Sequence, residues 1–159
     1  MTATYDLIAS NVLTSSVTSV TFSSIPSTYR DLVAVVSATA NTNANFNVTF
    51  NSDTGINYRY IRLQGNGSTA SSQSNMTHNA IFEQSIDTTA DQYIMQIMDY
   101  SVTDKHKIVL SRHNRPTAAL WGIASRWANT SAINTIQFAV PGGNTFSSGS
   151  TFYLYGIVS

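Results

Sequence analysis

The triplet Asp53-Thr54-Gly55 matches the motif that carries the catalytic aspartate of aspartic proteases. Such an enzyme needs a second Asp in a buried, hydrogen-bonded dyad, supplied by another copy of the motif or by the twin subunit of a homodimer. The chain contains no second Asp-Thr-Gly. A dimeric protease, with Leu-Trp-Gly (120–122) or Leu-Tyr-Gly (154–156) as the hydrophobic partner motif, is therefore kept as a remote alternative.

The residues around this triplet favour a structural role. Asp53 and Gly55 separate two stretches in which apolar and polar residues alternate, 45–50 and 57–64. An Asp side chain accepts hydrogen bonds from the nearby backbone, and Gly readily adopts positive φ. We predict a hairpin turn here, with Asp53 and Gly55 as turn residues, and expect Asp53→Asn to leave the fold intact.

The stretch 104–116 contains half of the Lys and Arg residues, in two clusters that flank Ile-Val-Leu. A basic strand of this kind suits an acidic surface on a partner protein, or phosphates and sulfated sugars. Lys, Arg and Pro also protect the edge strand of a sheet from pairing with another chain. The sequence leaves both interpretations open. The candidate partner-binding residues are Lys105, His106, Lys107, Arg112, His113 and Arg115.

Aromatic residues in the strand-like stretches provide a second candidate site. Their flat faces suit the apolar side of a sugar ring, as they suit other ring ligands. The alternative is that such residues form core on one face of a strand and a subunit contact on the other. The candidate glycan-binding residues are Tyr58, Tyr60, Trp121 and Trp127, with Tyr153 and Tyr155 as further members of the set.

Metal, cofactor and nucleophile chemistry lacks a recognisable motif. His78, His106 and His113 form no helical i, i+4 pair, and the chain has no Cys. The acidic residues between 83 and 99 fit no calcium-loop spacing, although a carbohydrate hydrolase built on them is a second enzymatic alternative. No G-x-S-x-G nucleophile elbow occurs. We therefore assign no catalytic, cofactor-binding or metal-binding residue, and predict that the protein is not an enzyme.

Length and composition predict one ordered domain, residues 1–159. The chain is 42% hydrophobic but only 10% charged, with a formal net charge of zero and a pI near 6.8. A protein without net charge has no field that attracts nucleic acid or an anionic membrane. No stretch approaches the roughly 18 apolar residues of a membrane span, and no signal peptide is visible, so we expect folding in a cytoplasm.

Apolar and polar residues alternate in short runs bounded by Ser, Asn, Gly and Pro, which is typical of half-buried antiparallel strands. The runs are 17–22, 45–50, 57–64, 92–99, 133–140 and 151–158, and the more continuously apolar stretch 31–38 is added to them. Residues 118–128 fit a strand with a glycine kink or a short helix, and the shared parity of Trp121, Ile123 and Ser125 favours the strand. Residues 86–98 are the best helix candidate, but their β-branched and aromatic content favours a strand entered from a polar loop. We predict an all-β protein, an antiparallel β-sandwich of about ten short strands and most simply a jelly roll, with a projecting polar loop at 65–77.

Three longer stretches form a recognisable set: VTFSSIPSTYRDLVAVVSA (20–38), FNSDTGINYRYIRLQGNGS (50–68) and FSSGSTFYLYGI (146–157). Together they resemble small virion proteins of tailed bacteriophages, of the type found in marine and cyanobacterial phages. The resemblance covers nearly the whole chain, with a looser match over 70–130. Within it, Pro26 is predicted to fix the connection between two strands, and Tyr29 and Asp31 to hold that corner by hydrogen bonds.

The resemblance implies a β-sandwich displayed on the virion, as a capsid decoration (cement) protein or as a tail-associated module. It also implies a homo-oligomer, most often a trimer, whose partners are its own copies and the major capsid protein or tail proteins. It supplies no catalytic residue and no cofactor. Our interpretation is a non-enzymatic structural protein that clamps coat subunits, and the alternative is a tail- or fibre-associated receptor- or glycan-binding module.

Overall fold

The computed structural model describes residues 4–115 and 119–158, and all regular structure in these ranges is β-strand. The twelve strands are β1 (Tyr5–Val12), β2 (Ser19–Phe22), β3 (Asp31–Ala38), β4 (Ala44–Phe50), β5 (Tyr58–Gly65), β6 (Ala70–His78), β7 (Ile81–Ile86), β8 (Asp91–Met98), β9 (Lys107–Arg115), β10 (Ala119–Trp127), β11 (Ile136–Ala139) and β12 (Thr151–Ile157). The predicted all-β class is confirmed, with two strands more than the ten expected.

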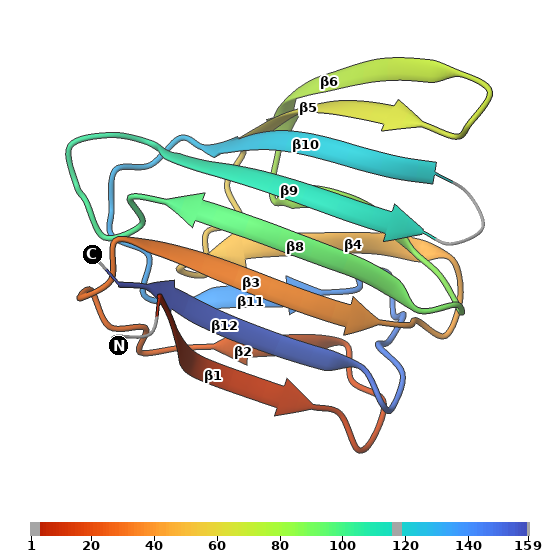
Figure 1. Cartoon of the computed structure of the whole chain (residues 1–159), viewed down its shortest axis with the longest axis horizontal. Coiled ribbons are helices and arrows are strands. Elements are labelled where there is room, and N and C mark those ends of the chain that lie inside the picture. Colours follow the sequence, from red (N-terminus) through yellow and green to blue (C-terminus); the bar gives the residue numbers. More distant parts are fainter. Residues whose placement is uncertain (1–3, 116–118, 159) are drawn as a thin grey trace.

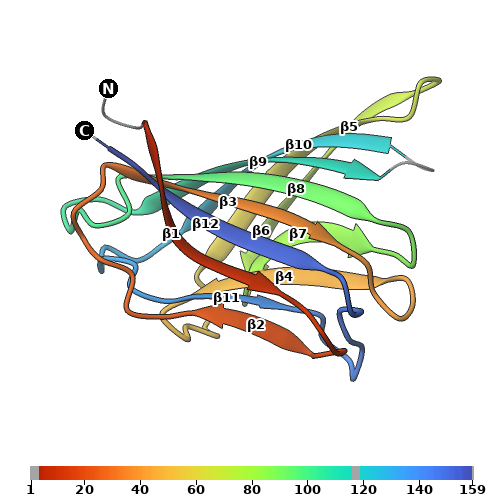
Figure 2. The same cartoon turned by 60° about the horizontal axis from the view of Figure 1, so that its bottom comes forward.

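The strands form two antiparallel sheets that pack face to face (Figures 1 and 2). One sheet has eight strands, in the order β1-β12-β3-β8-β9-β10-β5-β6, and the other has four, in the order β2-β11-β4-β7. The β5–β6 hairpin lies at one end of the larger sheet, opposite β1 (Figure 1). The smaller sheet therefore has too few strands to cover the whole inner face of the larger one.

The strand pairing is that of a jelly roll. β2 pairs with β11, β3 with β8, β4 with β7 and β5 with β6. These nested pairs describe one long two-stranded ribbon, closed at the β5–β6 turn and rolled so that successive pairs alternate between the two sheets. The β9–β10 hairpin is inserted between β8 and β5, and β12 and β1 extend the other end of the sheet.

Alternating side chains from both sheets fill the space between them. On β4, Phe46, Val48 and Phe50 face the core. The ring of Phe46 meets Tyr93 of the opposite sheet with centroids 4.4 Å apart, and it stacks on Phe138 of its own sheet. Burial of each such side chain stabilises the fold by roughly 1.5–3 kcal/mol. Apolar packing of this kind holds the sandwich together in a chain without Cys.

The predicted corner at Pro26 is held by groups that follow β8. The Tyr100 hydroxyl donates a hydrogen bond to the carbonyl oxygen of Pro26. Asp31 Oδ1 accepts a bond of 2.8 Å from the backbone N–H of the residue after β8, so its expected role is confirmed. The side chain of Tyr29 acts by packing instead, because its ring lies against Gly156 of β12.

The turn predicted at Asp53 is confirmed, but the hairpin is not. Asn51 and Ser52 have positive φ values of 51° and 58°, and the backbone N–H of Asp53 donates to the carbonyl oxygen of Phe50. The strands on either side, β4 and β5, belong to different sheets. The segment is therefore a corner that carries the chain from one sheet to the other. Turn residues reverse the direction of the chain, but they do not determine which sheet the next strand joins.

The polar stretch 65–77 also differs from its prediction as a loop. Most of it forms β6, which pairs with β5 along its length. The reversal is confined to a short turn in which Asn66 Oδ1 accepts hydrogen bonds from the backbone N–H and hydroxyl of Thr69, and Gly67 has positive φ. The sequence of β6 has no alternation of apolar and polar residues that would predict a strand. It is a strand because it pairs with β5.

Candidate functional site

The four aromatic residues predicted to bind sugars are core residues, so that prediction is wrong. Tyr58, Tyr60, Trp121 and Trp127 are only 0, 5, 9 and 1% exposed. Tyr58 and Trp127 stack with ring centroids 6.4 Å apart, and Trp121 Nε1 donates to Gln64 Oε1 at 3.0 Å. All four occupy the inner face of β5 and β10. Alternation reveals that a strand has two different faces, but it does not say which face is covered.

The predicted basic site is divided between different environments. Its exposed members are Lys105, His106 and Arg112, its half-buried member is Arg115, and its buried members are Lys107 and His113. β9 pairs with β8 on one side and β10 on the other, so the edge-strand interpretation is wrong. Successive side chains of this interior strand alternate between the core and the outer surface. Arg115 is occupied by an ion pair with Asp87.

Lys107 is a structural ammonium group at the start of β9. Its Nζ donates to the carbonyl oxygens of Lys105 at 3.1 Å and Thr130 at 3.0 Å, and to that of Val102. Burial lowers the pKa of Lys107, against the opposing attraction of Asp104. Three acceptors match the three protons of the ammonium group. Lys107 thereby joins the loop after β8 to the loop after β10.

His113 is enclosed between two aromatic rings. Its imidazole stacks on Tyr93 and Trp121 with centroid distances of 4.1 and 4.6 Å and interplanar angles of 14°. Its Nε2 lies 3.8 Å from Oδ2 of Asp91, and both side chains are fully buried. Burial lowers the pKa of His113, although Asp91 opposes the shift. The neutral ring therefore belongs to the core and adds no charge to the surface.

The carboxylate of Asp53 is occupied by structural hydrogen bonds. Oδ2 accepts from Trp127 Nε1 at 2.7 Å and from Asn57 Nδ2 at 2.9 Å, and Oδ1 accepts from Gly55 N at 2.8 Å. Burial favours the neutral acid, but these three bonds together lower the pKa of Asp53. Within the described residues, no hydrogen bond joins Asp53 to a second carboxylate. Through its bond with Trp127, Asp53 anchors the corner after β4 to β10, which is a structural role.

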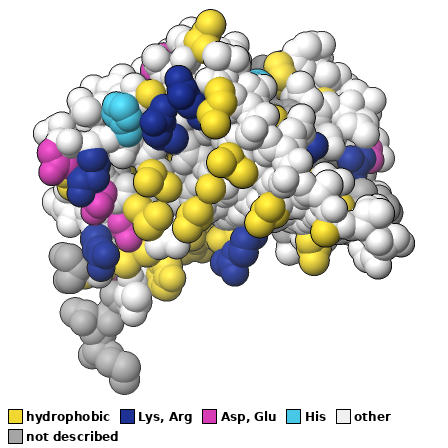
Figure 3. Space-filling view, turned by 90° about the horizontal axis from the view of Figure 1, so that it is seen from above, with side chains coloured by type: hydrophobic (Ala, Val, Ile, Leu, Met, Phe, Trp, Pro, Cys, Tyr) yellow, Lys and Arg dark blue, Asp and Glu magenta, His cyan; other side chains and the backbone are white. Residues whose placement is uncertain are grey.

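The outer face of the eight-stranded sheet is the strongest candidate for a functional surface. Side chains that alternate with the core residues point away from the four-stranded sheet here, and many are apolar. The large apolar residues exposed on this face are Tyr5, Leu7, Ile61, Leu63, Met76, Ile94, Ile108, Leu110 and Leu120. A space-filling view shows hydrophobic side chains in adjoining patches with Lys and Arg among them (Figure 3). Extended apolar patches on a soluble protein mark sites of association.

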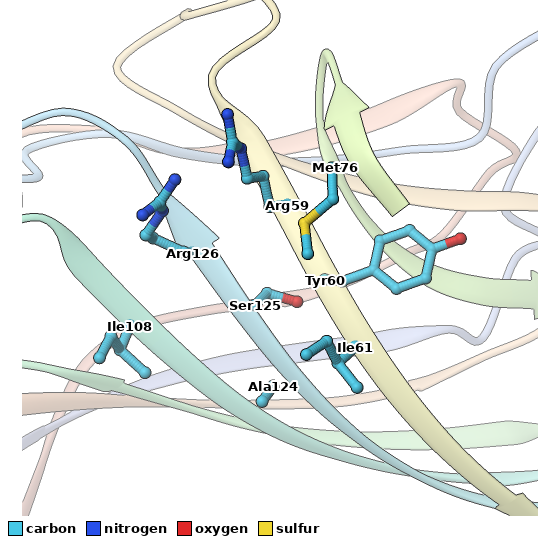
Figure 4. Close-up of a pocket in the computed structure, with 8 residues that line it drawn as sticks. All are labelled: Arg59, Tyr60, Ile61, Met76, Ile108, Ala124, Ser125 and Arg126. Carbon is cyan, nitrogen blue, oxygen red and sulfur yellow. The ribbon is translucent and has the colours of Figure 1, made fainter. Parts of the chain in front are cut away.

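A groove of about 310 Å³ lies where β9, β10 and β5 adjoin. Ile61 and Ile108 contribute to its apolar part, and Met76 of β6 flanks it. Arg59 and Arg126 come from neighbouring strands and extend to the same end of the groove (Figure 4). The groove thus combines an apolar floor with two guanidinium groups.

These two guanidinium groups lack a counter-ion in the described part of the chain. Arg59 and Arg126 are direct cross-strand partners, an arrangement of like charges that destabilises a sheet. Neither lies within ion-pair distance of a described Asp or Glu. In addition, Nε of Arg126 is buried without a hydrogen-bond partner. A carboxylate supplied from outside would satisfy both groups, because guanidinium binds carboxylate through paired hydrogen bonds.

A second hollow, of about 430 Å³, lies on the same sheet toward β1. Its lining includes Val33, Ile94 and Tyr155, with Arg112 as its cation. The ring of Tyr5 meets Tyr155 edge-on with centroids 6.5 Å apart. Neither this hollow nor the groove is lined by a described Asp or Glu. The outer face thus repeats one composition, an apolar floor beside unpaired arginine.

The sequence contains a signal for this surface that is independent of any motif. Ile108, Val109 and Leu110 are consecutive apolar residues, so both faces of β9 are apolar. On β5, Ile61 and Leu63 are apolar although they alternate with residues that face the core. A strand that is apolar on both faces is expected to be covered on both. The inner-facing side chains of β9 are buried in the sandwich, so its outer face is the one that needs a partner.

Comparison with known proteins gives no match among family models, curated proteins or solved structures. Among the described residues, no group of three or more His, Asp or Glu side chains is placed to hold a metal ion. The described part of the chain contains no helix that is long and apolar enough to cross a membrane. The outer face of the large sheet is therefore the feature from which we infer function.

Proposed function

We propose that this chain is a non-enzymatic structural protein of a bacteriophage virion, a capsid decoration protein that holds neighbouring subunits together. It acts by adhesion: a rigid sandwich presents the outer face of its eight-stranded sheet to its own copies and to the coat. The observation that carries the proposal is the exposed apolar face with its unpaired arginines. The sequence resemblance to virion proteins is the reason for placing the chain on a phage particle.

The chemistry of the outer face specifies its partner. Burial of apolar surface drives association, and a desolvated arginine at a contact is favourable only if the partner supplies a negative group. Arg59, Arg112 and Arg126 lie beside apolar hollows that lack acidic residues. The matching surface on a coat subunit is therefore apolar with exposed carboxylates. We therefore assign the acidic contact to these three arginines of the outer face, of which only Arg112 belongs to the predicted 104–115 stretch.

The location is tested by quantitative mass spectrometry of purified particles from the source virus. A copy number in fixed ratio to the major coat protein is expected for a decoration protein. A handful of copies per particle would move the chain to the tail. Absence from the particle would overturn the proposed function.

The contact is tested by rebinding purified chain to particles that lack it. Arg59→Ala with Arg126→Ala removes both guanidinium groups from the groove and is expected to weaken binding at least about tenfold, as loss of a buried charged contact does. Arg30→Ala is the matched control, because Arg30 is exposed and, among the described residues, its ion-pair partner is Asp31 of its own chain. Equal binding by the double variant and the control would exclude the groove as the contact.

A tail-associated glycan- or receptor-binding module is the second candidate, and one observation favours it. Tyr153 and Tyr155 stack with centroids 6.3 Å apart, and Tyr5 lies edge-on to Tyr155 at 6.5 Å, on the outer face. These partly exposed rings can accept a sugar, unlike the four buried aromatic residues. Tyr5→Ala should abolish binding of particles to host cells under this alternative, and leave it unchanged under the first.

A further inference from the structure

The two sheets of the sandwich have four edge strands, and three of them carry features that discourage pairing with another chain. β2 has only four residues. β1 is irregular between Leu7 and Ala9 and contains Asp6. β7 has only six residues and pairs irregularly with β4. Short length, irregular pairing and charge are the usual protections of an edge strand.

β6 is the least protected of the four. It has nine residues, with no Asp, Glu, Lys, Arg or Pro among them, and it pairs with β5 in continuous register from Ala70 to Asn75, with a register shift only beyond that, between Tyr60 and Tyr58 of β5. β5 is the only strand with which it makes extensive contact in the described part of the chain. Side chains on both of its faces are exposed. As the last strand of the large sheet, β6 is thus exposed on both faces as well as along its outer edge, so this end of the sheet is open to a further partner.

The free main-chain groups of β6 can be assigned from its pairing. The backbone N–H of Asn66 donates to the carbonyl oxygen of Thr69, so hydrogen-bonded and non-hydrogen-bonded pairs alternate from that point along the hairpin. Ser71 and Gln73 then exchange bonds with β5. Ala70, Ser72 and Ser74 direct their N–H and C=O groups to the open edge.

We propose that β6 pairs antiparallel with β6 of a second copy about a two-fold axis at Ser72. This register places Ala70 opposite Ser74 of the second copy and Ser72 opposite itself, so every outward N–H and C=O of these three residues finds an acceptor or donor. A charged residue at the axis would face the like charge of the second copy, and the residue there, Ser72, is uncharged. Ser71 and Gln73 also meet across the axis and can form a side-chain hydrogen bond.

The pairing also joins the outer faces of the two copies. Leu63 is the partner of Ser72 on β5 and is exposed on the outer face. Two-fold pairing of β6 therefore produces one sheet of sixteen strands, twice the eight of each copy, with a continuous apolar outer surface. The inference goes beyond the adhesive function, since it holds or fails in the isolated protein without any particle.

Sedimentation of the purified chain, with the variants Ser72→Lys and Ser72→Glu, tests this pairing. The wild type is expected to associate in pairs. Each variant alone places like charges face to face at the axis and should weaken association at least about tenfold. Equimolar mixing of the two variants should restore pairing, because Lys then faces Glu. Ser10→Lys on the exposed face of β1 is the control for added charge.

Each outcome is decisive for the inference. Wild-type behaviour of Ser10→Lys together with rescue in the mixture supports the β6 contact. A monomeric wild type at its highest soluble concentration overturns it, as does an oligomer, a trimer included, that Ser72→Lys leaves unchanged. Loss of association in Ser10→Lys as well, or failure of the mixture to recover, would equally overturn it. Unchanged thermal unfolding and circular dichroism of the variants exclude misfolding as the cause.

Discussion

The ring of Tyr29 lies so close to Gly156 that a Cβ atom at Gly156 would be 2.3 Å from Cγ of Tyr29. Tyr29 lies before β3, and Gly156 lies in β12. Their contact closes the corner after Pro26 against the sheet. The glycine is required because only a residue without a side chain leaves room for the ring.

Gly156→Ala is therefore expected to destabilise the protein. The ring must move to admit the methyl group, and overpacking of this kind costs about 1–3 kcal/mol. Urea unfolding measures the loss. Gly122→Ala is the control, because no atom lies within 4 Å of a Cβ at that position. Tyr29→Ala in the Gly156→Ala background should recover part of the lost stability, and the absence of any recovery would contradict the steric explanation.

Asp53→Asn is expected to lower the free energy of unfolding, in contrast to the tolerance expected from the sequence. Asn has one acceptor oxygen where Asp53 uses two, so a donor among Trp127, Asn57 and Gly55 loses its partner. The expected loss is about 1–3 kcal/mol near neutral pH, measured by urea unfolding. Asp104→Asn, at an exposed carboxylate, is the control.

The pH dependence of this loss provides a second check. The folded pKa of Asp53 is lowered from 3.8, so the stability contributed by its ionised form is present above that value and is lost as the pH falls through the lowered folded pKa. The difference between wild type and Asp53→Asn should shrink in that acid range. A difference that stays constant would show that the effect is steric and not ionic.

Lys107→Met is expected to destabilise the fold far more than Lys105→Met. The ammonium group of Lys107 is buried and satisfies three carbonyl oxygens, and each carbonyl left unsatisfied costs about 1–3 kcal/mol. Lys105 is exposed and pairs with exposed carboxylates, so its removal should cost less than about 1 kcal/mol. Thermal unfolding of the two variants is the measurement. Equal melting temperatures would contradict the role assigned to Lys107.

Stability is expected to fall as the pH drops below 6.5, because of His113. Its pKa is lowered by burial, so the unfolded chain binds a proton at pH values where the folded chain does not. The contribution of the neutral ring is therefore complete above pH 6.5 and is lost as the pH falls toward the lowered folded pKa. His113→Gln should flatten this part of the urea-unfolding profile, whereas His106→Gln, at an exposed position, should retain it.

The class of the fold followed from local pattern. Alternation in 45–50, 92–99 and 151–158 is sufficient to predict strands, because the side chains of a strand point to opposite faces with period two. Turn chemistry likewise predicted the reversal at Asp53, and the missing N–H of Pro26 predicted a corner. These features depend on residues close together in the chain, so the sequence by itself was enough to find them.

The sites could not be predicted in the same way. Lys107 and Arg112 lie on one strand and are both basic, yet Lys107 is buried and Arg112 lies on the outer face. The position of the second sheet determines which set of alternating side chains is buried. Likewise Tyr60 lies inside and Ile61 outside, the reverse of what their polarity implies. Pattern separates the two faces of a strand but does not say which one meets the second sheet.

The sequence by itself determined that this protein is all-β, where most of its strands lie and where the chain turns at Asp53 and Pro26. Only the tertiary structure decided that the turn at Asp53 crosses between sheets, that β9 is an interior strand, and that β6 is a strand at all. The physical reason is that these properties depend on pairing between segments far apart in the chain, such as β3 with β8. Local sequence determines the alternation of side chains along each strand. The neighbouring strands and the second sheet determine whether that strand lies at an edge and which of its faces is covered.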